Sequence, residues 1–285
     1  MTVEPREHPA KFSAAILKAI AAHVPAGAAV LDPLAGTGRI HQLRELVEGG
    51  CDTAAVELEP EWAAWDCRTI VGNALSLPFA DGTFDVLATS PTYGNRMADH
   101  HVAKDACGTC EGLKWITGNP VCPACKGTGL SRRMTYRHLL GRMPSADSSA
   151  VMAWGDEYRE FHERCWKEAA RALVPCARVI LNLKNPATTN GVPKFDLVGW
   201  HVAAWSRLGF EYVTLDRVAA QGFRQGANGQ QRTGYEVVVV MDRDGGPGCE
   251  MAPGACPDCG RWSCGCGGLA RAIEEHNAAC RICAP

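Results

Sequence analysis

The chain has 285 residues, of which 46% are hydrophobic and 21% are charged. This composition excludes a disordered chain and a coiled coil, and no apolar run reaches the roughly 18 residues of a membrane-spanning helix. Lys and Arg number 29 against 31 Asp and Glu, so any nucleic-acid binding would depend on a local basic patch. We expect a soluble, enzyme-sized protein with one large domain and something smaller.

The N-terminal third of the chain alternates between helical and strand patterns with short connections. The predicted elements, in chain order, are a helix with Phe12, Ile16, Leu17 and Ile20 on one face, a strand at Ala28–Leu31, a helix with Ile40, Leu43 and Val47, a strand at Ala54–Glu57, a helix opened by Pro60 and Trp62, and a strand at Phe84–Thr89. This order predicts an α/β fold with a doubly wound, Rossmann-like parallel sheet.

The pattern breaks at residues 97–152, which we interpret as an insertion between residues 1–96 and 153–243 of one core. The elements predicted for the second part are helices at Asp156–Leu173 and about Phe195–Leu208, and strands at Arg178–Leu181, Glu211–Leu215 and Glu236–Met241. The last strand is apolar throughout, which is typical of a strand buried on both faces. Residues 244–285 form a small cysteine-rich tail.

A glycine turn, Asp32-Pro33-Leu34-Ala35-Gly36-Thr37-Gly38, follows the first strand and precedes a helix. Its two glycines let a ligand approach the backbone near a helix N-terminus. His41 stands where a dinucleotide-binding turn has its third glycine, and no Lys-Ser/Thr follows, which argues against NAD and ATP. Glu57 closes the next strand, where a carboxylate can accept hydrogen bonds from ribose hydroxyls. S-adenosylmethionine is the adenosine cofactor that remains.

The segment Thr89-Ser90-Pro91-Thr92-Tyr93-Gly94 lies at the end of a predicted strand, where doubly wound folds place their chemistry. It resembles the signature of the amino-methyltransferases that act on DNA bases, Asp/Asn/Ser-Pro-Pro followed by an aromatic residue. Three further segments are similar to that family: His8–Phe12 to the part that closes over the cofactor's methionine, Asp32–Gly38 to its glycine turn, and Gly72–Ala74 to its Gly-Asp-Ala near the adenine.

The resemblance implies a class I methyltransferase sheet, S-adenosyl-L-methionine as cofactor and DNA as partner, with a target-reading region after the catalytic loop. The catalytic residues it implies are Ser90, Pro91, Thr92 and Tyr93. The cofactor-binding residues it implies are Lys11, Phe12, Asp32, Leu34, Ala35, Gly36, Gly38, Glu57, Leu58, Asn73 and Ala74. Ser90 in place of Asp favours cytosine N4 over adenine N6. Asn73 replaces the usual aspartate and can still pair with an amine.

The expected chemistry explains the residue types of the loop. An exocyclic base amine is a poor nucleophile, so acceptors must hold its N–H groups while the nitrogen becomes pyramidal. Ser90 and the Pro91 carbonyl could do this, and Tyr93 would stack on a base swung out of the helix. The methyl group would then move in line to nitrogen, with positioning supplying most of the acceleration.

Three alternatives stay open at this stage. Read alone, the Ser-Pro-Thr-Tyr segment could be an ordinary turn. The enzyme could instead methylate a base of RNA, as some tRNA-modifying enzymes with a similar loop do. Thr92 stands where the family has its second proline, so the chain could also be a zinc-dependent nucleic-acid binding protein without activity.

Eleven of the 15 cysteines fall in two clusters. Two Cys-x-x-Cys knuckles, Cys107/Cys110 and Cys122/Cys125, have the spacing of a closed, structural zinc site. In the tail, Cys256, Cys259, Cys280 and Cys283 suit another zinc, although Cys249, Cys264, Cys266 and His276 are also available and an iron–sulfur cluster is an alternative. Knuckles without an N-terminal signal-peptide core indicate a reducing, cytoplasmic location and no membrane association.

Two further groups of residues receive alternative interpretations. The segment Ser131–Arg142 carries four arginines and no acid, so it could contact DNA phosphates, or it could be a solvated helical face paired with acids elsewhere. Four single cysteines are expected to be small buried apolar residues. They are Cys51, Cys67, Cys165 and Cys176. Single histidines at 8, 162 and 201 are expected to be local hydrogen-bonding residues.

Overall fold

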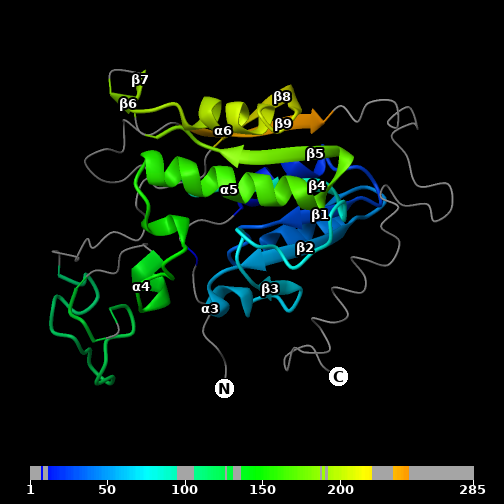
Figure 1. Ribbon diagram of the computed structural model, residues 1–285. Helices are drawn as coiled ribbons and strands as arrows, with labels where there is room; N and C mark the ends of the chain where they lie inside the picture. Colours follow the sequence, from blue (N-terminus) through cyan, green and yellow to red (C-terminus); the bar gives the residue numbers. More distant parts are fainter. Residues whose placement is uncertain are drawn as a thin grey trace.

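A twisted seven-stranded sheet forms the centre of the computed structural model, which describes residues 8, 12–94, 106–125, 127–130, 136–186, 188–189, 192–219 and 234–243 (Figure 1). The strand order is β3-β2-β1-β4-β5-β9-β8. The strands are β1 Ala29–Asp32, β2 Asp52–Glu57, β3 Thr69–Val71, β4 Phe84–Thr89, β5 Leu173–Leu183, β8 Phe210–Ala219 and β9 Tyr235–Arg243. Only β9 runs antiparallel to its neighbours in this sheet; the other pairs are parallel.

The helices and minor elements complete the described chain. They are α1 Ala14–Ala21, η1 Arg39–Gln42, α2 Leu43–Leu46, α3 Pro60–Ala63, α4 Tyr136–Leu140, η2 Ser149–Val151, α5 Asp156–Ala172, α6 Leu197–Ser206 and the small hairpin β6 Thr188–Thr189 with β7 Val192–Pro193. Among them, no helix has the length and apolarity needed to cross a bilayer.

Most predicted elements of the core are confirmed, including the doubly wound α/β sheet. The predicted helix around Ile40–Val47 is instead a 3-10 turn followed by the short α2, and the helix opened by Pro60 ends at Ala63. Strand β3 was not predicted, because three residues at a sheet edge are too few to show a period.

The sheet separates two apolar layers, because alternate side chains of a strand point to opposite faces. In β1, Ala29 and Leu31 belong to one layer, while Val30 belongs to the other. The first layer is closed by α5 and α6, which contribute the fully buried Trp166 and Trp205. The second is closed by α1, η1 and α2 on the opposite face (Figure 1). Both layers hold the strand ends in fixed positions.

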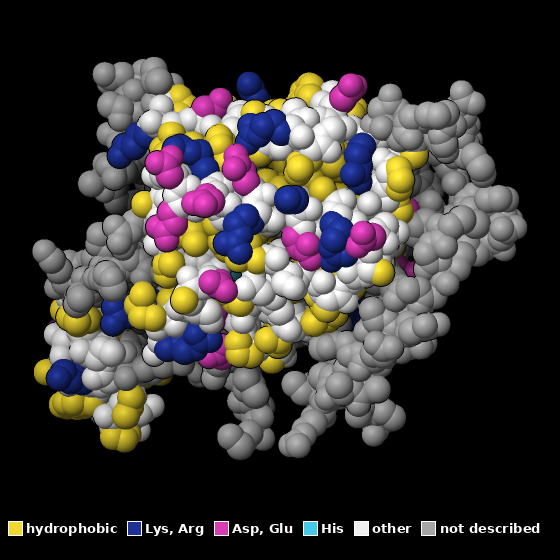
Figure 2. Space-filling view, in the orientation of Figure 1, with side chains coloured by type: hydrophobic (Ala, Val, Ile, Leu, Met, Phe, Trp, Pro, Cys, Tyr) yellow, Lys and Arg dark blue, Asp and Glu magenta, His cyan; other side chains and the backbone are white. Residues whose placement is uncertain are grey.

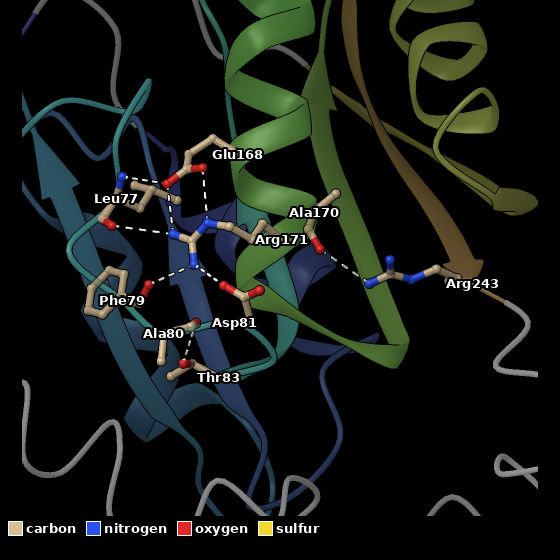
Figure 3. A network of polar contacts seen from close by, with 9 residues as sticks. All are labelled: Leu77, Phe79, Ala80, Asp81, Thr83, Glu168, Ala170, Arg171 and Arg243. Atoms are coloured by element: carbon tan, nitrogen blue, oxygen red, sulfur yellow. Dashed lines mark hydrogen bonds and ion pairs between the residues drawn. The ribbon is translucent and has the colours of Figure 1, made fainter.

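Arg171 on α5 anchors the segment that leads into β4 (Figure 3). Its guanidinium donates to the Glu168 carboxylate at 3.0 and 2.7 Å, to the Phe79 carbonyl at 2.9 Å and to the Asp81 carboxylate at 2.6 Å. Glu168 also accepts the Leu77 N–H at 2.8 Å. One side chain therefore satisfies several polar groups of an irregular segment that has no sheet partner of its own.

Replacing Arg171 by Met keeps the apolar stem and removes these hydrogen bonds. We expect Arg171→Met to lower the free energy of unfolding by about 1–2 kcal/mol, because the partners lose charge-assisted bonds although the group is about a third exposed. Arg207→Met is the matched control, since within the described part of the chain Arg207 makes one ion pair, with Glu163, and both are about half exposed. Denaturant unfolding should show a loss of at most about 0.5 kcal/mol for that control. Equal losses in the two variants would contradict the anchoring role.

Opposite charges are interspersed on the face that carries α5 (Figure 2). Ion pairs there join Arg159 to Asp156 at 2.5 Å and Arg207 to Glu163 at 2.7 Å. On the described residues of this face, Lys and Arg thus alternate with Asp and Glu, and no continuous basic patch forms.

Candidate active site

A cavity of about 660 Å³ opens at one edge of the sheet, where β1, β2, β4 and β5 end and β9 begins. This edge includes the point between β1 and β4 where the strand order reverses, which is where doubly wound folds bind ligands. The glycine turn and the Ser-Pro-Thr-Tyr loop, predicted separately, line the same cavity. Its lining includes the predicted residues Phe12, Leu34, Ala35, Gly36, Glu57, Leu58, Asn73, Ala74, Ser90, Pro91, Thr92 and Tyr93. Lys11 lies outside the described residues.

Glu57 is fixed at the end of β2 by two backbone N–H groups. Gly36 donates to its Oε2 at 2.7 Å, and Glu59 donates to its Oε1 at 2.9 Å. Gly36 has a φ of +55°, a left-handed conformation that costs glycine little. Burial raises the pKa of Glu57 to about 7. The turn and the carboxylate therefore form one preorganised acceptor at the cavity wall.

Asp32 and Gly38, which were predicted to bind the cofactor, lie behind the cavity and do not line it. Asp32 Oδ1 accepts from Thr89 Oγ1 at 2.6 Å and from the Leu34 N–H at 3.1 Å, so this carboxylate joins the ends of β1 and β4. Burial raises the pKa of Asp32 to about 7. A Cβ on Gly38 would lie 2.5 Å from Thr69 Oγ1. Asp32 and Gly38 therefore contact other residues of the protein and not the cavity.

Thr92, which stands where the resembling family has a second proline, is held in place by hydrogen bonds. Thr92 Oγ1 donates to Ser149 Oγ at 2.9 Å, and the Thr92 carbonyl oxygen accepts the Tyr158 hydroxyl. Ser90 Oγ and the Tyr93 hydroxyl lie 3.4 Å apart at the other side of the loop. The constraint that a proline ring would supply is here provided by two contacts from outside the loop.

A chain of oriented hydrogen bonds supports this loop from the core. The Trp166 indole can only donate, so His201 Nδ1, at 3.1 Å, is the acceptor. The His201 proton is therefore on Nε2, which lies 3.1 Å from the Tyr158 hydroxyl, and Tyr158 donates onward to the Thr92 carbonyl. Burial lowers the pKa of His201 well below its usual value, which keeps the ring in this neutral form. His201 is thus a local hydrogen-bonding residue, as expected.

Three aromatic rings close one side of the cavity. His8 packs edge-on against Trp62 and Tyr136, with ring centroids 4.3 and 5.2 Å apart, and Trp62 lies 5.2 Å from Tyr136. All three line the cavity. The sequence placed Tyr136 in a segment that was interpreted either as a contact for DNA phosphates or as a solvated helical face, and only its aromatic character could have suggested a cavity wall.

Two polar side chains are already engaged with other residues of the protein. Asn73 was expected to pair with an amine, and its Nδ2 donates to Asp147 Oδ2 at 2.9 Å while its Oδ1 accepts from the Leu75 N–H at 2.9 Å. Arg142 was a candidate phosphate contact. Its guanidinium instead pairs with Glu59 and Glu61, each at 2.6 Å, so for this residue the alternative of pairing with acids holds.

The four knuckle cysteines converge in a buried group. The Sγ atoms of Cys107, Cys110, Cys122 and Cys125 all lie within 4.8 Å of one another, with pairs at 4.0 and 3.7 Å. Four Zn–S bonds of about 2.3 Å in a tetrahedron would place sulfurs roughly 3.8 Å apart. The donor set therefore fits a tetrahedral metal. The predicted tail ligands, residues 256, 259, 280 and 283, lie outside the described residues.

The expectation for the single cysteines is partly wrong. Cys51 and Cys165 are buried, as predicted. Cys67 and Cys176 are exposed, because the first follows the end of α3 and the second lies in the early, outer part of β5.

No protein-family model matches this sequence, and no curated protein matches it. Solved structures do match. A TehB-like SAM-dependent methyltransferase from Corynebacterium glutamicum is 15% identical over 81% of this chain and 88% of its own, with a TM-score of 0.41. A SAM-dependent methyltransferase from Methanosarcina mazei is 12% identical over 79% and 96%, with a TM-score of 0.44. A putative methyltransferase from Haloferax volcanii, in complex with the Trm112 methyltransferase activator, is 12% identical over 79% and 87%, with a TM-score of 0.46.

The class of fold follows from the sheet. Seven strands in the order 3-2-1-4-5-9-8, with only β9 reversed among them, form a Rossmann-like, doubly wound α/β sheet, as predicted.

Proposed function

We propose that this protein transfers a methyl group from S-adenosyl-L-methionine to an exocyclic amine of a DNA base, with cytosine N4 favoured over adenine N6. One observation carries the proposal: the glycine turn with Glu57 and the Ser90–Tyr93 loop line one continuous cavity. A nucleoside cofactor held at the turn would therefore face a planar amine held at the loop.

The residues at the turn fit such a cofactor. Each Glu57 oxygen accepts one backbone N–H and has a further lone pair available for a ribose hydroxyl. Gly36 leaves the cavity open beside His8, since a Cβ there would lie 3.0 Å from His8 Nε2. When bound, S-adenosylmethionine supplies an electrophilic methyl group on a sulfonium.

The loop residues would prepare the amine. Ser90 Oγ and the Pro91 carbonyl accept its N–H groups and let the nitrogen lone pair turn toward the methyl group. Tyr93 provides an aromatic face for the base, and its pKa is raised by burial, so the hydroxyl stays neutral. The base must leave a duplex to reach this cavity. Holding the two reactants in line supplies most of the rate enhancement.

The test is transfer of labelled methyl from S-adenosylmethionine to mixed-sequence duplex DNA and to structured RNA, followed by digestion and mass spectrometry. N4-methylcytosine in DNA is the expected product. Incorporation into RNA alone would contradict the assignment of DNA, and binding of S-adenosylhomocysteine without transfer to either polymer would contradict the assignment of nucleic-acid amines.

We also propose that the four knuckle cysteines hold a structural zinc ion. Cys110→Ser should lower the zinc content by one ion per chain relative to the wild type, because three thiolates no longer close the site. The zinc content per chain is measured by elemental mass spectrometry of the denatured protein. Cys51→Ser is the control, since Cys51 is buried beneath the sheet in another part of the fold. An unchanged zinc content in Cys110→Ser would exclude the site.

A further inference from the structure

Two polar side chains lie at the end of the cavity that the Ser90–Tyr93 loop forms, and they belong to none of the motifs found in the sequence. Asn182 lies on β5 and is 3% exposed, and Glu236 lies on the neighbouring β9. Both line the cavity next to Ser90. Neither a buried amide nor a half-buried carboxylate is needed to hold two strands together, since their backbones are already paired in register.

The hydrogen bonds fix the orientation of the Asn182 amide. Its Nδ2 lies 3.1 Å from Glu236 Oε2 and 3.4 Å from Ser90 Oγ. A carboxylate only accepts, so the nitrogen must face Glu236, and its two hydrogens go to Glu236 and Ser90. Asn182 Oδ1 is then buried and has no hydrogen-bond partner among the described residues. Such a group is costly unless a ligand or water completes it.

This end of the cavity is therefore rich in acceptors, and one of them is a carboxylate. The acceptors are the Pro91 carbonyl, Ser90 Oγ and the Glu236 carboxylate. Among the residues that the structure describes, Lys184 pairs with Glu236, and its Nζ lies 4.0 Å from Oε1. Charge on Glu236 is felt at the loop, because it contributes, after burial, to the raised pKa of Tyr93. A ligand that brings N–H groups suits such a site, and one that brings a carbonyl oxygen does not.

We infer that Glu236 is a catalytic residue that shares one amine hydrogen of the substrate with Ser90 Oγ while the Pro91 carbonyl holds the other, and that Asn182 is a positioning residue that holds Glu236 and Ser90 at the correct separation. This inference rests on the proposed function and specifies its substrate class as a planar amine. As the carbon–nitrogen bond forms and the carbon–sulfur bond breaks, positive charge moves to nitrogen. One N–H bond then breaks, its electron pair stays on nitrogen, and the proton binds a Glu236 oxygen before it passes to water.

The first test compares Glu236→Gln with Glu211→Gln. Glu211 is exposed on the neighbouring strand β8 and does not line the cavity. We expect Glu236→Gln to lower kcat for methyl transfer by at least about tenfold and to leave KM for S-adenosylmethionine within about twofold, since only the amine side of the cavity is altered. Glu236→Asp keeps the charge and should retain more activity than the Gln variant. Glu211→Gln should match the wild type, and thermal melts should confirm that all variants are folded.

A binding test does not depend on turnover. Cytosine presents an amino group where thymine presents a carbonyl, so labelled oligo(dC) and oligo(dT) differ at the relevant atom. In the presence of S-adenosylhomocysteine, fluorescence anisotropy should show that the wild type and Glu211→Gln prefer oligo(dC) at least about threefold, and that Glu236→Gln loses this preference.

The role of Asn182 is tested by a double-mutant cycle. If Asn182 acts through Glu236, the losses of kcat in Asn182→Ala and Glu236→Gln will be far from additive, whereas a role in stability alone would add. Additive losses would overturn the positioning role.

The outcomes separate this inference from the proposed function. Methyl transfer by the wild type with unchanged kcat and unchanged oligo(dC) preference in Glu236→Gln would overturn the inference alone. Loss of oligo(dC) preference in Glu236→Gln, without transfer by the wild type, would support the amine site and contradict the proposed reaction. A wild type with neither transfer nor preference would overturn both.

Discussion

Replacing Gly36 by Ala is expected to weaken binding of S-adenosylhomocysteine by at least about tenfold, equivalent to about 1.4 kcal/mol. Gly36 has a φ of +55°, where an L side chain costs about 1–2 kcal/mol. The new Cβ would also lie 3.0 Å from His8 Nε2, inside the cavity. The Gly36 N–H orients Glu57, so any shift of the turn also moves the carboxylate. Isothermal titration calorimetry measures the effect directly.

Gly82→Ala separates backbone strain from the effect on the site. Gly82 has a similar φ of +63°, but a Cβ there has no neighbour within 4 Å, and this residue does not line the cavity. Both variants should lose about 1–2 kcal/mol of unfolding free energy to backbone strain, and the contact with His8 should add to the loss in Gly36→Ala, while only Gly36→Ala loses affinity for the ligand. Equal affinities in the two variants would remove the glycine turn from the binding site.

Ser90→Ala is expected to lower kcat for methyl transfer by about 100-fold and to leave the affinity for S-adenosylhomocysteine unchanged. Ser90 would accept an amine hydrogen as charge develops on the nitrogen. In oxyanion holes, the loss of one preorganised hydrogen-bonding group lowers the rate roughly 10²–10³-fold, and we expect an effect of similar size here. The variant also deprives Asn182 of one acceptor, at 3.4 Å. Single-turnover kinetics with labelled cofactor would measure the rate of the chemical step.

Ser206→Ala provides the matched control, because Ser206 ends α6, is exposed and does not line the cavity. It should retain both the affinity and the rate of the wild type. A Ser90→Ala variant that transfers methyl at the wild-type rate would leave the Pro91 carbonyl and Glu236 as the acceptors and would remove Ser90 from the catalytic set. A variant that loses cofactor affinity instead would place Ser90 against the cofactor.

The order of helices and strands was predictable because each signal is local. Strand β4 was predicted with its observed bounds, Phe84–Thr89, since a compact apolar run ends at a proline-containing loop. Helix α5 was predicted to within one residue because its buried positions, such as Tyr158 and Cys165, recur at helical spacing. The alternation of helices and strands predicted a doubly wound parallel sheet, but the strand order was established only by the structure.

The two halves of the candidate site could also be predicted, because each is a short continuous segment. Gly36 and Ser90 were singled out by their neighbours along the chain and by their place at strand ends, which the doubly wound fold brings to one edge.

The remaining contacts in and around the cavity were decided by the tertiary structure alone. Tyr136 packs against Trp62 and His8, Arg142 pairs with Glu59 rather than with phosphate, and Asn182 meets Glu236 across two strands. These partners are far apart in the sequence, and no local pattern records which distant side chain satisfies a buried polar group or covers an aromatic ring. Packing and hydrogen-bond completion settle such choices only when the whole chain has folded.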